Sequence, residues 1–353
     1  MKKTISVILS VVFVLAFTGC TSIVTPVHPN NNGSENGING NNATDPNGTN
    51  GYEDPPPPPI SPADLPPAPS VDVPPLWVKN VPHGVADFVG FAQTQLTGAH
   101  GEYYIGMADL LNPDGYRHID DSGLIHPAST IKCQIMEYAL LQVHAGNADV
   151  SEMIDGLTLM YLIERMIQVS CNDSTGSLIA RFGRANIQSW LDVNYPDTEL
   201  NSDWRGYNHN SEYNASSVRD TIAFLERVWK NRDEQPYERM LDIMFGTTFS
   251  RLKIPAVIEE FEGVKIANKT GSFIDGAKTA DHDMAIVIKY GANGDIEFAY
   301  ALTFYSFSQF IDEETYSAAR PAIISMSLDI YERVRENHEK FALYYSENPG
   351  ARP

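Results

Sequence analysis

Apolar residues recur at regular intervals from about residue 80 onward, and the interval changes along the chain. Between residues 84 and 96 they lie three or four positions apart, at Val85, Phe88, Val89, Ala92 and Leu96, which predicts an amphipathic helix. The segments "GEYYIGMADLL" and "YRHID" flank the sequence "NPDG" and predict a β-hairpin, because Asn, Pro, Asp and Gly each favour a turn. The folded part is therefore expected to open with a helix and two strands.

Helical spacing continues through the middle of the chain, and strand-like segments return near its end. Helices are predicted over residues 131–144, 157–169, 175–182, 218–230 and 316–337. Strands are predicted in "GVKIANKTGSF", "DMAIVIKY" and "DIEFAYALTFYS". This order predicts an α/β fold of the α+β type. An antiparallel sheet of about five strands is built from both chain ends and flanked by terminal helices, and an all-helical subdomain is inserted between its halves.

The first twenty residues predict export. "MKK", the apolar run "ISVILSVVFVLAF" and "TGC" are typical of a signal peptide over residues 1–20, too short to span a membrane comfortably. The ending "FTGC" resembles a lipobox, in which Cys20 would be lipidated, and a plain signal with a chance cysteine is the alternative. We therefore expect a protein that crosses the cytoplasmic membrane and is lipid-anchored on the extracytoplasmic face of the cell envelope.

Composition sets the remaining boundaries. Asn, Gly and Pro dominate residues 21–80, which predicts a disordered linker. A folded domain is expected over residues 81–345, with an α/β part at 81–127 plus 262–345 and a helical part at 128–261.

The net charge of −20 argues against a nucleic-acid partner. Cys133 and Cys171 could form a disulfide or serve as small core side chains.

The stretch "HPASTIKCQIM" holds the first candidate group. Pro127 suits the first turn of a helix, so Ser129 and Lys132 would share one helical face. Serine becomes a nucleophile when a base takes its proton, and lysine can be that base when burial or another cation lowers its pKa. Spacing alone also fits a polar residue that caps an ordinary helix.

The stretch "MIQVSCNDSTGSLIARFG" holds the second group. Ser170 has a hydroxyl that could relay a proton, and Asn172 has an amide that could bind a carbonyl while it contacts a lysine. The alternative is a turn between two helices, with Ser170 or Asn172 as the N-cap.

The strand segment "KIANKTGSF" holds the third group. Gly271 would allow a ligand to approach the backbone closely, Lys269 supplies a cation, and Ser272 could offer an N–H at the strand edge. The occurrence of all three groups in this order, more than any one of them, indicates a shared site.

Together, "PASTIK", "SCN" and "NKTGS" resemble the SxxK, SDN and KTG motifs of the class A β-lactamases and related penicillin-interacting serine hydrolases, with Cys171 in place of Asp. The resemblance spans roughly residues 81–337. It implies a β-lactamase/transpeptidase-like fold and a serine hydrolase that a β-lactam amide acylates and water then regenerates. The substrate would be a β-lactam or a cell-wall peptide, with no cofactor, and a monomer is expected.

The resemblance also implies a role for each motif residue in proton transfer. Ser129 would be the acylated nucleophile and Lys132 a candidate base for acylation. Ser170 would pass a proton to the leaving nitrogen, and Lys269 would order the proton network. Two lysines that face one site raise the cost of charging both, which favours a neutral Lys132.

Other motif residues would bind the substrate. By the same resemblance, Asn172 would hold a side-chain carbonyl and Thr270 would bind the substrate carboxylate. The backbone N–H groups of Ser129 and Ser272 would form the oxyanion hole, and Gly271 would belong to the binding residues.

The residue that activates the deacylating water is left open by the sequence. Class A enzymes resemble one another in using a loop glutamate, two residues before a Glu-Leu-Asn sequence, to activate this water. In "YPDTELNSDWRGYNHNSEY" the match to Glu199, Leu200 and Asn201 places Asp197 at that position, and Glu199 or Glu212 would serve if the loop is threaded differently. All three acids could equally be solvated loop residues.

Three functions therefore stay open. With a positioned carboxylate the enzyme hydrolyses β-lactams, and without one it is a D-Ala-D-Ala peptidase, a penicillin-binding protein or an esterase. A non-catalytic cell-wall sensor is the third, although a pure binder needs no nucleophile. No metal site is expected, because "DHD" at residues 281–283 lies on a strand and His282 has no helical partner at metal-ligand spacing.

Overall fold

The structure is a computed structural model that describes residues 101–347, apart from residues 112–115, 203, 205–212, 250, 276–277, 310 and 312–316. The predicted signal peptide with Cys20, the linker, the helix over 84–96, the "NPDG" turn and Glu212 lie outside the described residues. Within the described part, no helix combines the length and the apolar character that a membrane span requires.

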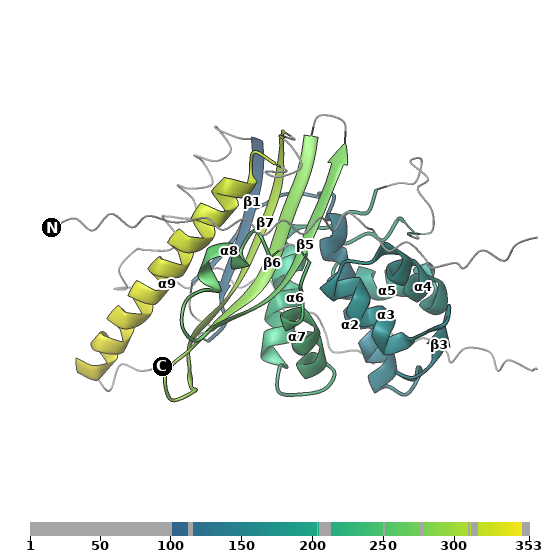
Figure 1. Ribbon diagram of the computed structural model, residues 1–353, viewed down its shortest axis with the longest axis horizontal. Coiled ribbons are helices and arrows are strands. Elements are labelled where there is room, and N and C mark those ends of the chain that lie inside the picture. Colours follow the sequence, from purple (N-terminus) through teal and green to yellow (C-terminus); the bar gives the residue numbers. More distant parts are fainter. Residues whose placement is uncertain are drawn as a thin grey trace, which may run out of the picture. The chain divides into compact units, whose positions relative to one another are not determined.

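A five-stranded antiparallel sheet forms the centre of the described part (Figure 1). Its strand order is β2-β1-β7-β6-β5, so strands from the beginning and the end of the domain pair side by side. This confirms the predicted sheet built from both chain ends. The strands are β1 (Gly101–Asp109), β2 (Arg117–Ile119), β5 (Val264–Asp275), β6 (Lys278–Tyr290) and β7 (Ile296–Gln309).

Alternating side chains of the sheet pack against helices on both faces. Val287 and Leu302 join Ile323 and Ile330 in one apolar cluster, on the face covered by α8 (Pro255–Ile258) and the last helix, α9 (Arg320–Glu347). Their neighbours in sequence, such as Ile286, belong to the other cluster, on the face covered by α6 (Val218–Lys230). This is the period-two pattern of a strand buried on both faces.

The helical part lies between the two halves of the sheet in sequence, as predicted (Figure 1). It is not all-helical, because β3 pairs with β4 in a two-stranded sheet within it. Helices α5 and α7 and the short α8 were not predicted, although α5 and α7 carry buried residues at helical spacing, such as Ile187, Trp190 and Leu191 in α5. The elements are η2 (Ala128–Ile131), α2 (Lys132–His144), β3 (Met153–Ile154), β4 (Leu157–Thr158), α3 (Leu159–Gln168), α4 (Asn172–Phe182), α5 (Arg184–Asn194), α6 and α7 (Tyr237–Phe245).

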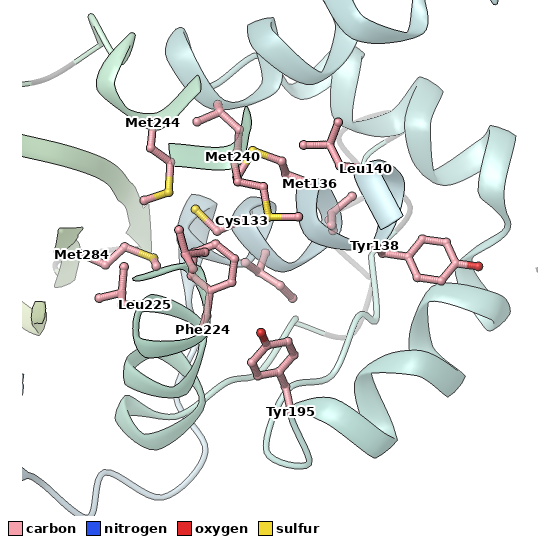
Figure 2. Packing of buried hydrophobic residues seen from close by; sticks show 14 of the residues in the cluster. Cys133, Met136, Tyr138, Leu140, Tyr195, Phe224, Leu225, Met240, Met244 and Met284 are labelled. Atoms are coloured by element: carbon pink, nitrogen blue, oxygen red, sulfur yellow. The ribbon is translucent and has the colours of Figure 1, made fainter. Parts of the chain in front are cut away.

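Helix α2 is the buried axis of the helical part. Every residue from Lys132 to Gln142 is buried. Figure 2 shows Cys133 and Met136 of α2 among apolar side chains of α6 and α7, including Phe224 and Met240. Cys133 and Cys171 are both buried and no disulfide joins them, so the disulfide alternative is excluded and both serve as core side chains.

Candidate active site

Ser129 lies in a short 3-10 turn that leads directly into α2. Both the N–H and the hydroxyl of Thr130 donate to the Pro127 carbonyl, at 3.1 and 2.7 Å, which fixes the turn. Residues three apart eclipse in a 3-10 helix, so Ser129 and Lys132 share a face as the spacing predicts. One detail of the prediction is wrong, because Pro127 is the N-cap of the turn and does not lie inside it.

The backbone is left-handed at two non-glycine residues of the motifs. Ala128, directly before Ser129, has φ +49°, and Ser170 has φ +56°. Such a conformation costs an L-residue on the order of 1 kcal/mol, because Cβ approaches the following carbonyl oxygen. The surrounding fold therefore holds both predicted catalytic hydroxyls in place against a local preference.

Gly271 brings the third motif against the first. A Cβ atom at Gly271 would lie 2.9 Å from both the Ser129 nitrogen and the Pro127 oxygen. Only a glycine fits between strand β5 and the turn without displacing backbone atoms. The close approach predicted for this residue is thus to the chain's own backbone, beside the N–H of the predicted nucleophile.

Lys132 is completely buried beneath the site. Its Nζ donates to the Ser170 carbonyl at 2.8 Å and to Asn172 Oδ1 at 2.7 Å, and lies 3.4 Å from Ser170 Oγ. It also lies 4.6 Å from the centre of the Trp204 ring, within reach of a cation–π interaction. Lys132 thus ties the first motif to the second.

Lys269 approaches the same hydroxyl from strand β5. Its Nζ donates to Ser170 Oγ at 2.9 Å and to the Thr270 carbonyl at 2.6 Å. Burial lowers the pKa of Lys269 to about 8, and the nearby Lys253 ammonium acts in the same direction. A second cation therefore adds to burial in disfavouring the charge of Lys269, and the neutral Lys132 stays a prediction.

Ser170 connects the two lysines. Its half-buried hydroxyl accepts hydrogen bonds from both ammonium groups, so it is suited to pass a proton between a base and a ligand. The alternative in which Ser170 or Asn172 caps α4 is wrong, because the N-cap is Cys171 and its side chain makes no cap hydrogen bond. The Cys171 thiol instead receives an Arg165 N–H at 3.8 Å.

The predicted binding residues lie around this centre. Asn172 is exposed and its Oδ1 is engaged by Lys132, which leaves its NH₂ group available to donate to a ligand. Thr270 is buried and Ser272 is half-buried on β5, an edge strand of the sheet. Alternate N–H groups of an edge strand are not used by the sheet, as the predicted oxyanion role of Ser272 requires.

Asp197 and Glu199 bind elsewhere in the described part. Asp197 Oδ2 accepts from the Ser217 hydroxyl at 2.9 Å, at the start of α6. Glu199 is exposed, its backbone pairs with Ala215, and its carboxylate accepts from Asn201 at 3.2 Å. Among the described residues neither carboxylate hydrogen-bonds to the two lysines or to Ser170. Their role in deacylation stays a prediction.

Sequence reasoning missed several residues that the structure brings to the site. Trp204 lies over Lys132, and its indole N–H is buried without a hydrogen-bond partner among the described residues. Lys253 donates to the Ser272 hydroxyl at 3.0 Å. Neither carries a local signal, because Trp204 lies in a loop and Lys253 precedes a helix of only four residues.

His282 has a structural role. Its Nδ1 accepts from the Ser306 N–H at 3.1 Å, so its Nε2–H donates to the His126 carbonyl at 2.9 Å. Burial lowers the pKa of His282 to about 3, which keeps the ring neutral. Within the described ranges no group of three metal-ligating side chains comes together.

The arrangement as a whole defines a class of site. A half-buried serine at the start of a helix, two buried lysines and a hydroxyl between them are suited to acyl transfer through a serine ester. Residues 92–334 match the Beta-lactamase enzyme family, and the chain belongs to that family. The expected fold is confirmed with it.

Solved structures share the fold at low sequence identity. The TLA-3 extended-spectrum β-lactamase is 15% identical, with a TM-score of 0.59 over 71% of this chain and 99% of its own. The β-lactamase from Sphaerobacter thermophilus is 18% identical, with 0.56 over 71% and 97%. A variant of PBP-A, solved as its acyl-enzyme complex with penicillin G, is 19% identical, with 0.59 over 75% and 100%. No curated protein matches the chain.

Proposed function

We propose that the protein is a serine hydrolase that β-lactams acylate at Ser129, and that water then hydrolyses the acyl-enzyme. The observation that carries the proposal is the convergence of two buried ammonium groups on the Ser170 hydroxyl, beside the turn that holds Ser129. Membership of the family supports it, as does a PBP-A variant of the same fold that forms an acyl-enzyme with penicillin G.

The geometry suggests the following sequence of steps. Ser129 Oγ attacks the carbonyl carbon of the lactam while a lysine takes its proton, and the N–H groups of Ser129 and Ser272 stabilise the oxyanion. The carbon–nitrogen bond then breaks, and Ser170 passes a proton to the nitrogen. With its pKa at about 8, Lys269 is neutral in about a tenth of the molecules at pH 7, so it can share the role of base with Lys132.

A second candidate function follows from what lies next to Lys132. The Trp204 ring covers its ammonium, and the carboxylates of Asp197 and Glu199 are engaged by other partners. A site without an aligned carboxylate would form the acyl-enzyme and release it slowly. These contacts favour a D-Ala-D-Ala peptidase or another penicillin-binding protein on the same scaffold.

One experiment separates the two functions. The full chain in detergent is mixed with a chromogenic cephalosporin or with penicillin G, and intact mass is followed with time. Steady colour release supports the hydrolase, and a penicilloyl adduct that persists for hours supports the penicillin-binding protein. If neither colour nor adduct develops, the proposal is wrong.

A matched pair of serine variants tests the nucleophile. Ser129→Ala removes the oxygen that is acylated, so we expect no adduct. Ser189→Ala removes an exposed hydroxyl of α5 and should label at the wild-type rate. An adduct on Ser129→Ala would assign the reaction to another residue.

We also propose that the chain is exported and lipid-anchored through Cys20, because "FTGC" follows an apolar run of signal-peptide length. The mass of the mature N-terminal peptide tests this directly. A diacylglycerol adduct on Cys20 is expected, and Cys20→Ala should release the protein from the membrane fraction. An unmodified Cys20 peptide would refute the anchor.

A further inference from the structure

A buried group of charges lies behind the Ser272 end of strand β5. Lys253 and Asp281 are completely buried, and Lys253 Nζ lies 2.6 Å from Asp281 Oδ1. Arg320 reaches the same carboxylate from α9, with Nε 3.0 Å from Asp281 Oδ2, and the Ser317 hydroxyl donates to it at 2.8 Å. Three segments that are distant in sequence therefore meet at one carboxylate.

Ser272 is part of this group. Its hydroxyl donates to Asp281 Oδ1 at 2.9 Å and accepts from Lys253 Nζ at 3.0 Å. Hydrogen bonds to charged groups are about twice as strong as neutral ones, so this side chain is firmly held. Because the hydroxyl is engaged on the inner side, what Ser272 can offer a ligand is its backbone N–H.

The neighbouring strand is adapted to hold the group. At Asp281 and His282 the contacts between β6 and β7 are made by side chains. The Ser306 N–H donates to His282 Nδ1 at 3.1 Å, and the Ser306 hydroxyl donates to the Asp281 carbonyl at 2.6 Å. Lys253 also donates to the His282 carbonyl at 2.7 Å. The ammonium is thus fixed by the backbone as well as by Asp281.

The charge of Lys253 also reaches the catalytic lysine. Burial opposes ionisation of Asp281, yet Lys253 and Arg320 hold its pKa below the ordinary value, so the carboxylate is charged. Two cations therefore share that one carboxylate. After burial, the Lys253 ammonium is the main influence that lowers the pKa of Lys269, while Cys133 on α2 and Asp283 on β6 oppose it.

We infer that Lys253 is a positioning residue of the acyl-transfer site: its buried ammonium, paired with Asp281, fixes Ser272 beside Ser129, and its charge acts on Lys269. This inference rests on the proposed function. The simpler role, in which the charges only join α9 to the sheet, would affect stability alone. The two roles therefore differ in the rate and the pH profile of acylation by folded protein.

The experiment compares Lys253→Met and Lys253→Arg in the full chain. The probes are penicillin G and a fluorophosphonate, which labels nucleophilic serines without need of a β-lactam. Labelling rates are measured from pH 6 to 9.5 by intact mass. Lys289→Met is the matched control, because Lys289 is a half-buried lysine of strand β6 that pairs with Glu297 and not with Asp281. It should behave as the wild type.

Lys253→Met is expected to label at least about tenfold more slowly, because the Ser272 N–H loses its fixed position. Its titration step near pH 8 should move to higher pH, because Lys269 loses a neighbouring cation while Cys133 and Asp283, which raise its pKa, remain. Lys253→Arg keeps the charge and should restore the position of the step.

The outcomes separate the two proposals. If neither probe labels the wild type, Ser129 is no nucleophile, and the proposed function falls together with the role of Lys253. If the wild type labels and Lys253→Met has the same rate and the same pH step, only the role of Lys253 falls. Should Lys253→Met fail to fold, Ser272→Ala decides, since labelling at the wild-type rate would overturn the positioning role.

Discussion

The close contact between Gly271 and the turn of Ser129 gives a prediction that can be worked out in numbers. In Gly271→Ala the new Cβ would lie 2.9 Å from the Ser129 nitrogen and the Pro127 oxygen, where an ordinary contact begins at 3.4 Å. Both neighbours are backbone atoms that cannot rotate away. Strand β5 and the turn must therefore separate by about 0.5 Å.

This separation moves the two N–H groups that are expected to bind the oxyanion. Loss of one oxyanion donor lowers a rate by roughly 100- to 1000-fold, and a misplacement of about 1 Å can lower it by about 100-fold. For half of that displacement we expect Gly271→Ala to be acylated about 10- to 100-fold more slowly. Overpacking should also lower the free energy of unfolding by about 1–3 kcal/mol.

The assay is the rate of penicilloyl adduct formation, measured on protein whose folded fraction is known from urea denaturation. Gly106→Ala is the control, because its Cβ would lie 2.6 Å from side-chain atoms of Val218 and Ile222, away from the motifs. It should lose stability but keep the acylation rate of the folded molecule. A folded Gly271→Ala that is acylated at the wild-type rate would refute an oxyanion hole between Ser129 and Ser272.

Three further predictions concern the residues around the two lysines. Asp197→Asn should lower the free energy of unfolding by about 1 kcal/mol, because it weakens the hydrogen bond to Ser217, while Glu199→Gln should not lower it. If the penicilloyl adduct lives longer in one of these variants, the substituted residue takes part in deacylation. Trp204→Ala uncovers the Lys132 ammonium to water and should therefore shorten the lifetime of the penicilloyl adduct, whereas Trp204→Phe keeps a ring there and should preserve it. Equal lifetimes in wild type and Trp204→Ala would show that the ring does not affect deacylation. Burial lowers the pKa of Lys269 from 10.5 to about 8. Between pH 8 and 10.5, therefore, Lys269 is protonated in the unfolded chain and largely neutral in the folded one. Relative to Lys269→Met, the free energy of unfolding of the wild type should rise by up to ~3 kcal/mol as pH rises from 8 to 10.5, as measured by urea denaturation. If the difference between the two proteins does not change with pH, burial does not lower the pKa of Lys269.

The motifs were predictable from sequence because their geometry is local. The spacing of Ser129 and Lys132 follows from one turn of helix, and Lys269 and Gly271 follow from one strand. The sheet was predictable as well, since its strands contain short apolar runs and the segments between them carry Gly, Asn and Pro.

The remainder of the site depends on contacts between distant segments. Lys253 lies 28 residues before Asp281 and resembles an ordinary solvated lysine in the sequence, whereas both side chains are completely buried. The "DHD" pattern gives no sign that its Asp281 binds two cations, because both come from segments that are distant in sequence. Trp204 follows the candidate acids in the loop, and nothing in a linear pattern predicts which ring lies over Lys132.

The pairing of β1 with β7 also has a consequence for the time at which activity begins. Gly101 pairs with Ser308, about 200 residues later, so the sheet cannot close until nearly the whole domain has been synthesised. Contacts of such long separation are slow to form, because the entropy of a long loop must be overcome first. Lys269 and Gly271 likewise join Ser129 only after β5 has emerged. A nascent chain therefore carries an inert serine, and reactivity arises only once the last strand is in place.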